Sequence, residues 1–239
     1  MKPYAEQDSK KEQVSRMFDG IARRYDMLDH LLSLGIDLSW RRNVVREIKK
    51  LAHGNILDVA TGTGDLAVET ARRIPDAAIT GCDISREMLR MGRRKAVKKK
   101  VWSRITFIHA DAEALPFAAA AFDVVTVAFG VRNFQNAGAG LREMHRVLKP
   151  GGTVFVLEFS VPQGKIFGPL YRFYFKNVLP CIGGLFSRDY DAYKYLPSSV
   201  EEFPLPEIFM KHLEDAGFGR CTARKLTRGV AVIYKGEKI

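Results

Sequence analysis

The chain has 239 residues, of which 46% are hydrophobic and 10% aromatic, so it can bury a sizeable core and is not a disordered protein. The charged start at residues 1–11 and the scattered Cys82, Cys181 and Cys221 predict a cytoplasmic protein with free thiols, without a secretory signal, disulfide framework or metal. The net charge of +11 suits either nucleic acid or an anionic membrane surface, and composition does not choose between them.

Two amphipathic helices are predicted ahead of the first strand. Apolar residues recur at helical spacing over 14–32 and 38–51, which indicates an N-terminal helical cap at about residues 12–52. Much of the positive charge lies in two helical stretches, 41–50 and 86–100, which we interpret as solvated helix faces. Neither stretch interleaves the aromatic residues of a base-stacking platform, so we expect no nucleic-acid partner.

Strands and helices then alternate along the chain. Short apolar runs predict strands at 55–60, 78–82, 105–109, 121–128 and 153–159, with helices at 65–73, 86–99 and 137–148. Residues 149–152, Lys-Pro-Gly-Gly, are interpreted as the stop between the last of these helices and its strand. A helix at 205–216 and an antiparallel hairpin at 220–226 and 230–234 complete the pattern. The prediction is one α/β domain over 1–239 with a doubly wound, mostly parallel seven-stranded sheet.

A glycine-rich turn follows the first strand and carries the first candidate site. Asp58 precedes the turn, and Gly62, Thr63 and Gly64 form it, where a doubly wound sheet holds its cofactor. Gly62-x-Gly64-x-x-Ala67 also satisfies a relaxed dinucleotide fingerprint, with an acidic residue about 20 positions on. Asp58 suits a cationic amino group, however, which favours an amino-acid nucleoside over a pyrophosphate.

Two further strands end in carboxylates. Asp83 can accept hydrogen bonds from both ribose hydroxyls, and the alternative is an N-cap of the next helix, for which Ser85 is at least as suitable. Asp111 and Ala112 follow the third strand, where an adenine would bind, and the alternative for Asp111 is a turn-former. We predict a ribose site at Asp83 and an adenine site at Asp111.

The chain from about residue 14 onward resembles a known family. Its motifs are Phe-Gly-Val-Arg-Asn at 129–133, Arg-Val-Leu-Lys-Pro-Gly-Gly at 146–152 and Leu-Glu-Phe-Ser at 157–160. These resemble the menaquinone and ubiquinone biosynthesis C-methyltransferases, the demethylmenaquinone methyltransferases. A proximal signature is partly met by Tyr-Asp-Met-Leu-Asp at 25–29. The sequence departs from it at three positions, where the family has Met, Asn and His and this chain has Leu28, Asp29 and Asp37.

The resemblance implies a class I methyltransferase fold with S-adenosylmethionine as cofactor, bound at Thr63, Asp83 and the Asp111–Ala112 pair. It implies methyl transfer to a ring carbon of a polyprenyl quinol, without a metal. Arg132 is the candidate for stabilising a quinolate, and Asn133 for adding a hydrogen bond. The structural alternative for these two residues is a strand-end ion pair and turn. No histidine is singled out as a proton acceptor.

An insertion at about 164–200 interrupts the alternation and is predicted to be a lid over the carboxyl edge of the sheet. Its apolar residues have helical spacing: Phe167, Leu170, Tyr171, Tyr174, Val178 and Ile182. They fit either plain core or a wall for an isoprenoid tail, with Arg172 and Lys176 meeting anionic head groups. No stretch approaches the ~20 apolar residues of a membrane span.

We therefore expect peripheral contact with the inner face of the membrane and a homodimer. Two alternatives remain open. One is a methyltransferase of another small-molecule acceptor, and the other is a basic nucleic-acid-binding protein on this fold.

Overall fold

The structure is a computed structural model, and it describes residues 2–4, 7–33, 35–51, 54–162, 168 and 190–239. Most of the predicted lid, at about 164–200, lies outside the described residues. Its end, from residue 190, belongs to helix α8 (Tyr190–Glu202). The aromatic run between Phe167 and Ile182 therefore stays a sequence prediction.

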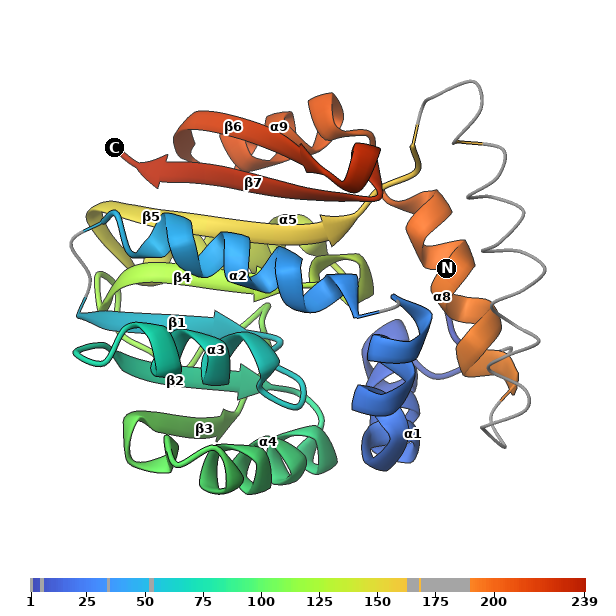
Figure 1. Cartoon of the computed structure of the whole chain (residues 1–239). Helices are drawn as coiled ribbons and strands as arrows, with labels where there is room; N and C mark the ends of the chain where they lie inside the picture. Colours follow the sequence, from blue (N-terminus) through green and yellow to red (C-terminus); the bar gives the residue numbers. More distant parts are fainter. Residues whose placement is uncertain (1, 5–6, 34, 52–53, 163–167, 169–189) are drawn as a thin grey trace.

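A seven-stranded sheet forms the centre of the molecule (Figure 1). Its strands are β1 (Asn55–Val59), β2 (Ala78–Asp83), β3 (Ile105–His109), β4 (Phe122–Ala128), β5 (Leu148–Phe159), β6 (Phe218–Leu226) and β7 (Ala231–Lys238). Their order is β3-β2-β1-β4-β5-β7-β6, and within this sheet β7 runs in the direction opposite to the other six strands. This confirms the predicted doubly wound, mostly parallel sheet with a closing hairpin.

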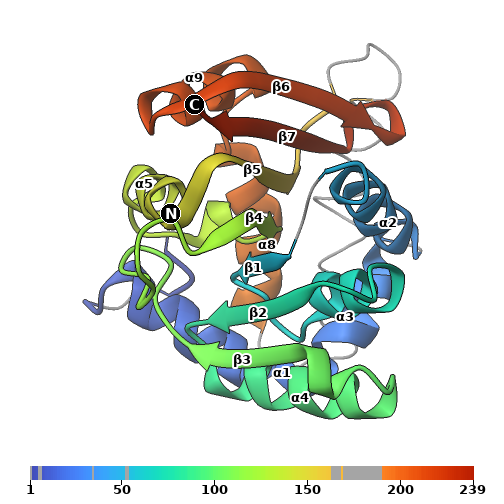
Figure 2. The ribbon, with the colours of Figure 1, turned by 90° about the vertical axis from the view of Figure 1, so that its left-hand side faces the viewer.

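Helices cover both faces of the sheet, as Figure 2 shows in an end-on view. One face packs against α2 (Ile36–Ile48), α3 (Asp65–Arg73) and α4 (Arg86–Lys98), and the other against α5 (Ala137–Val147) and α9 (Pro206–Asp215). Neighbouring residues alternate between the two cores, so Ile56 lies in one and Leu57 in the other. Because both faces are buried, central strands such as β4 and the second half of β5 are almost continuously apolar, whereas the edge strand β6 alternates.

The carboxyl ends of the parallel strands point toward two further helices (Figure 1). Helix α1 (Lys10–Leu32) and helix α8 lie beyond that edge of the sheet, together with the short 3-10 turn η2 (Val131–Asn133) that follows β4. Ser15 Oγ on α1 donates to the Ile84 carbonyl at 3.3 Å, and Ser85 Oγ donates to Asp19 Oδ1 at 2.6 Å. Helix α1 is thereby attached to the loop that follows β2.

The segment 149–152 is not the stop that its Lys-Pro-Gly-Gly sequence predicts. It belongs to β5, which begins directly after α5 at Leu148. Phe122 pairs with Leu148 but Val124 pairs with Thr153, so the additional residues bulge out of the ladder. Gly151, with φ 76°, permits the bend, and Lys149 Nζ donates to Asp123 Oδ1 at 2.6 Å. Pairing with β4 overrides the local turn signal here.

Candidate functional site

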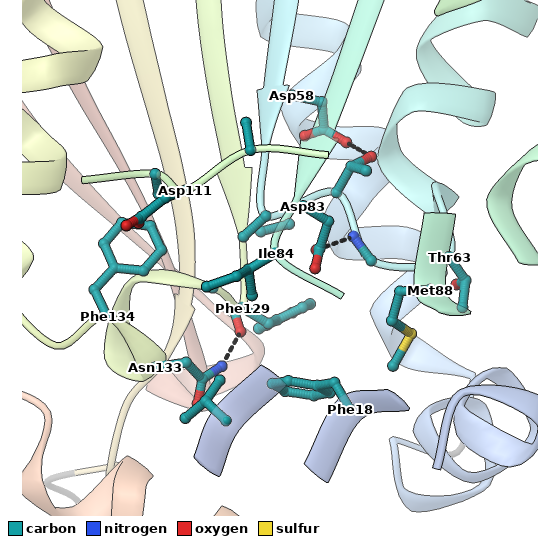
Figure 3. Close-up of a pocket in the computed structure, with 18 of the residues that line it drawn as sticks. Phe18, Asp58, Thr63, Asp83, Ile84, Met88, Asp111, Phe129, Asn133 and Phe134 are labelled. Carbon is teal, nitrogen blue, oxygen red and sulfur yellow. Dashed lines mark hydrogen bonds between the residues drawn. The ribbon is translucent and has the colours of Figure 1, made fainter. Parts of the chain in front are cut away.

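A pocket opens at the carboxyl ends of β1, β2, β3 and β4, with α1 forming its opposite wall (Figure 3). The empty volume enclosed by the lining residues, together with the open solvent at its mouth, is about 920 Å³. The strand order aligns three carboxylates along it, with Asp111 after β3, Asp83 on β2 and Asp58 on β1. The pocket therefore joins residues that are far apart in the sequence and that the sequence analysis chose separately.

The glycine turn after β1 brings backbone into the pocket. Gly62 (φ 57°) and Gly64 (φ 79°) both have the left-handed conformation that favours glycine. A Cβ at Gly64 would lie 3.1 Å from the Phe107 ring, whereas a Cβ at Gly62 would meet nothing within 4 Å. Conformation and packing thus both favour glycine at position 64, and conformation favours it at position 62. The open space beside Gly62 is available to a ligand.

Asp83 is held by backbone N–H groups. The amide of Gly62 donates to Oδ2 and that of Ser85 to Oδ1, both at 2.8 Å. Burial raises the pKa of Asp83 to about 6, although both hydrogen bonds oppose that shift. Ser85, not Asp83, is the N-cap of α4, because its Oγ accepts from the Met88 amide at 3.1 Å. The carboxylate of Asp83 is therefore not required for capping.

Asp58 is the innermost carboxylate of the pocket. The hydroxyls of Thr61 and Thr126 donate to its two oxygens at 2.6 and 2.7 Å. Burial raises its pKa to about 6, and these two hydrogen bonds oppose the rise. A cationic ligand group beside Asp58 would favour its ionised form.

Thr63 lines the pocket, and its hydroxyl accepts from Lys95 Nζ at 2.9 Å. Lys95 also forms an ion pair with Asp65 at 2.5 Å. This pair joins α4 to the first turn of α3 and fixes the end of the glycine turn.

At the other end of the pocket, Asp111 and Ala112 lie on the turn after β3. The Glu113 amide donates to Asp111 Oδ1 at 2.9 Å, which is the hydrogen bond of the turn-former that the sequence also allowed. Asp111 Oδ2 is bound by Lys11 of α1, and this hydrogen bond raises the pKa of Lys11. Lys11 was not found from the sequence, because it belongs to the charged start of the chain.

The two predicted catalytic residues occupy different places on η2. Asn133 lines the pocket, and its Nδ2 donates to the Phe129 carbonyl at 3.3 Å (Figure 3). Arg132 lies behind it, where Nη1 donates to Glu158 at 2.9 Å and to the Phe129 carbonyl at 2.5 Å. Burial is the largest single influence on the pKa of Arg132 and lowers it, but the charge and hydrogen bond of Glu158, together with Tyr25 and Tyr195, raise the pKa above its ordinary value. The ion pair that the sequence analysis gave as the structural alternative is thus present.

Two polar atoms on η2 are buried without a hydrogen-bond partner among the described residues. They are Arg132 Nε and Asn133 Oδ1. Buried polar atoms in folded proteins nearly always have a partner, so a ligand or water is expected at each. Glu158 belongs to the Leu-Glu-Phe-Ser motif, but the sequence analysis assigned it no function. The signal that could have identified it is a charged residue within the apolar run of β5, because a buried carboxylate needs a partner.

Aromatic side chains line the pocket opposite the carboxylates. Phe18 and Tyr25 of α1 contact each other edge to face, with ring centroids 5.9 Å apart. Phe129 also lines the pocket, and its ring is supported from outside the lining by Phe159, which stacks on it at 4.4 Å, and by Trp40. This wall suits a flat apolar ligand.

Helix α2 corrects one interpretation of the sequence. Residues 41–50 were expected to form a solvated face, and Arg42, Arg46, Lys49 and Lys50 do so. Arg41 instead is buried, lines the pocket and forms an ion pair with the buried Asp37 one helical turn earlier. The expectation was wrong for Arg41 because its burial depends on the ion pair with Asp37, and a run of like charges in the sequence does not show which residue has such a partner.

Within the described part of the chain, no helix is long and apolar enough to cross a membrane. Nor do three or more His, Cys, Asp or Glu side chains gather there in a group that could hold a metal ion.

Comparison with solved structures supports the fold. A SAM-dependent methyltransferase of Thermotoga maritima, described as a possible histamine N-methyltransferase, aligns with a TM-score of 0.67 at 20% identity. The alignment covers 94% of this chain and 99% of that one. This confirms the predicted class I methyltransferase fold.

Comparison with protein families and curated relatives is more specific. The model of the ubiE/COQ5 methyltransferase family matches residues 6–238. The ubiquinone/menaquinone biosynthesis C-methyltransferase UbiE of Geotalea daltonii is 51% identical over 96% of this chain and 97% of its own. The demethylmenaquinone methyltransferase of Bacteroides fragilis is 42% identical over 100% and 97%. The predicted resemblance is confirmed, and the chain belongs to the ubiE/COQ5 methyltransferase family.

Proposed function

We propose that the protein transfers the methyl group of S-adenosylmethionine to a ring carbon of a polyprenyl quinol, converting demethylmenaquinol to menaquinol or acting on the equivalent ubiquinone precursor. Family membership makes the chain a methyltransferase that uses S-adenosylmethionine. The observation that carries the proposal is the row of Asp111, Asp83 and Asp58 along one pocket that also has an aromatic wall.

The cofactor side of the pocket consists of this row and the glycine turn. In the proposal Asp111 and Ala112 bind the adenine, and Asp83 accepts hydrogen bonds from the ribose hydroxyls. Asp58 faces the cationic amino group, with Gly62, Thr63 and Gly64 beside the methionine chain. The residues fit the cofactor, because its amino and sulfonium groups are cationic and the lining is rich in carboxylates. When bound, the cofactor supplies an electrophilic methyl group.

The acceptor side consists of Asn133, Phe18, Tyr25 and Phe129. The aromatic rings would hold the quinol ring flat against the cofactor side, and Asn133 Oδ1 would accept a hydrogen bond from a quinol hydroxyl. Methyl transfer is a displacement whose rate depends on the alignment of donor and acceptor. The quinol hydroxyl gives its proton to solvent, and the ring carbon bonds to the methyl group as the sulfur–methyl bond breaks. The hydrogen of that ring carbon then moves as a proton to the quinol oxygen, which restores the aromatic ring.

Arg132 supplies a fixed positive charge behind Asn133 in this proposal. That charge would favour the ionised quinol, in which the ring carbon is more nucleophilic. Glu158 fixes the guanidinium by accepting from both its side chain and the Arg132 backbone amide. Arg132 remains charged, so it does not remove the proton itself.

The quinol tail implies access from a membrane. We include peripheral contact with an anionic membrane surface, at the inner face, in the proposal, supported by the net charge of +11. The homodimer stays a prediction.

The test is incubation with labelled S-adenosylmethionine and a panel of demethylated naphthoquinols and benzoquinols under reducing conditions. We expect label on the ring carbon of at least one quinol, and no transfer to the oxidised quinones. Transfer to none of the quinols by protein that binds the cofactor would favour another small-molecule acceptor.

A further inference from the structure

The bound cofactor presents the pocket with one anionic group, the carboxylate of its methionine. The pocket is lined by five acidic residues, which are Asp58, Asp65, Asp83, Asp111 and Glu113. A carboxylate that enters this lining is repelled unless a cation receives it. Among the described residues that line the pocket, Lys11 and Arg41 are the basic ones.

The strand order assigns these two cations to opposite ends. Lys11 binds Asp111, beyond β3, where the proposed function puts the adenine. Arg41 lies over the Phe129 ring at the end of β4, with its guanidinium carbon 5.2 Å from the ring centroid. Its Nη2 is 4.0 Å from Asp65, and its charge lowers the pKa of Asp58. Arg41 is therefore the cation at the methionine end.

Arg41 is also fixed in position before any ligand binds. Its side chain is 6% exposed, and Nη1 is bound to Asp37, which is fully buried. Asp37 in turn accepts a hydrogen bond from Ser33 Oγ at 2.5 Å. A guanidinium has five N–H donors in a planar fork, so a contact with Asp37 does not preclude a second carboxylate.

We propose that Arg41 binds the methionine carboxylate of S-adenosylmethionine and that Asp37 positions it. This proposal deepens the proposed function, because it rests on the assigned direction of the cofactor in the pocket. It also gives a structural reason for Asp37, one of the residues at which the sequence departs from the pattern that it resembles. The consequence is specificity: the pocket discriminates against an adenosyl sulfonium that lacks the carboxylate.

The test compares two ligands, S-adenosylmethionine and its decarboxylated analogue, by calorimetry on the full chain. We expect the wild-type protein to prefer the carboxylated ligand by about 10- to 100-fold, the range of a charge-assisted hydrogen bond to a buried cation. Arg41→Gln should lose most of this preference by weakening the carboxylated ligand while changing the decarboxylated one by less than about threefold. Arg42→Gln is the matched control on the next residue, and it should keep the preference, since Arg42 is exposed and paired with Glu69.

Arg41→Gln leaves the buried Asp37 without its counter-charge, so the double variant Asp37→Asn with Arg41→Gln serves where the single variant does not fold. The double variant should show the same loss of preference. The proposal is overturned if either folded variant keeps the wild-type preference, or if Lys11→Gln loses it instead. Asp83→Ala separates the assigned cofactor site from the role of Arg41. This variant should weaken the binding of both ligands alike. If it weakens neither, the assigned cofactor site is wrong, and not only the role of Arg41.

Discussion

The cofactor side and the acceptor side of the pocket are built from different parts of the fold. Asp58, Asp83 and Asp111 stand at the ends of neighbouring parallel strands, and their hydrogen bonds come from adjacent loops. Phe18 and Tyr25 come from α1, which reaches the sheet through side chains such as Lys11 and Ser15. The difference indicates that the cofactor side is preformed, whereas the acceptor side depends on how α1 packs.

The largest effect is expected behind the acceptor side, where Arg132 pairs with the fully buried Glu158. Glu158→Gln leaves a buried guanidinium without its counter-charge, which should lower the free energy of unfolding by about 3–5 kcal/mol in urea titrations. Asp123→Asn is the control, because it breaks the more exposed pair with Lys149 and should cost about 1 kcal/mol or less. Equal losses in the two variants would show that burial does not distinguish these pairs.

Arg132→Lys tests whether the charge behind Asn133 serves the reaction. Lysine keeps the charge but loses the planar guanidinium, whose Nη1 donates to both Glu158 and the Phe129 carbonyl and whose Nε has no partner among the described residues. We expect turnover to fall on the order of 100-fold while the affinity for S-adenosylmethionine changes little. Steady-state kinetics and calorimetry measure the two quantities. A lower melting temperature with near-normal turnover of the folded protein would make the pair purely structural.

Asp83→Ala tests the cofactor side in the same way. Loss of a carboxylate that accepts from the ribose should weaken S-adenosylmethionine binding by about 1.5–3 kcal/mol, or at least about tenfold. The Gly62 amide also loses its acceptor, so thermal unfolding of the variant is measured alongside calorimetry. Unchanged affinity in a folded variant would remove Asp83 from the site.

The pH dependence of binding follows from the raised pKa values. Asp58 and Asp83 both have a pKa of about 6 in the ligand-free fold, above the ordinary value, because burial disfavours the charge. Their protonated forms cannot accept as carboxylates, so affinity should fall as pH drops through 6, about tenfold per unit for each group. In Asp83→Asn one of the two contributions should disappear. An affinity that stays constant down to pH 5 would contradict the assignment.

The same raised pKa values have the opposite effect on the stability of the ligand-free protein: stability rises as the pH falls, whereas affinity for the cofactor decreases. A carboxyl whose pKa is raised on folding destabilises the fold when ionised. Its unfavourable contribution is therefore present above pH about 6 and diminishes as the pH falls toward the unfolded value of about 3.9.

The smallest effect is expected at Lys11, where α1 meets the adenine end. The pair with Asp111 is about one-third exposed on both side chains, so breaking it is worth about 1 kcal/mol or less. Lys11→Gln should therefore weaken S-adenosylmethionine and its decarboxylated analogue equally, by less than about fivefold. A larger loss for both ligands would mean that cofactor binding also depends on the packing of α1. The cofactor side would then not be preformed, and the two sides of the pocket would differ less than we infer.

The cofactor side and the acceptor side also differ in how much of each the sequence predicts. The strand at Ile105–His109 and the helix at Asp65–Arg73 match their predicted bounds, because local apolar patterning determines them. Asp58, Asp83 and Asp111 follow predicted strands, so the topology alone brings them to one edge. Residues whose position depends on packing between helices could not be found in this way.

Arg41 and Lys149 illustrate that limit. Arg41 stands among exposed cations, and its burial depends on Asp37 and on the packing of α2 over Phe129. Lys149 begins a turn-like sequence that pairing with β4 converts into strand. In both cases a tertiary partner overrides a correct local signal.

The most direct measurement is a crystal structure of the protein with S-adenosylhomocysteine and a short-chain demethylated quinol. The account predicts adenine beside Asp111 and Ala112, ribose hydroxyls on Asp83 and the carboxylate at Arg41. It predicts a quinol ring against Phe18, with an oxygen at Asn133. The ring carbon should lie in line with the sulfur, across the gap that the methyl group occupies. A cofactor in the reverse direction, or a quinol bound away from Asn133, would contradict it.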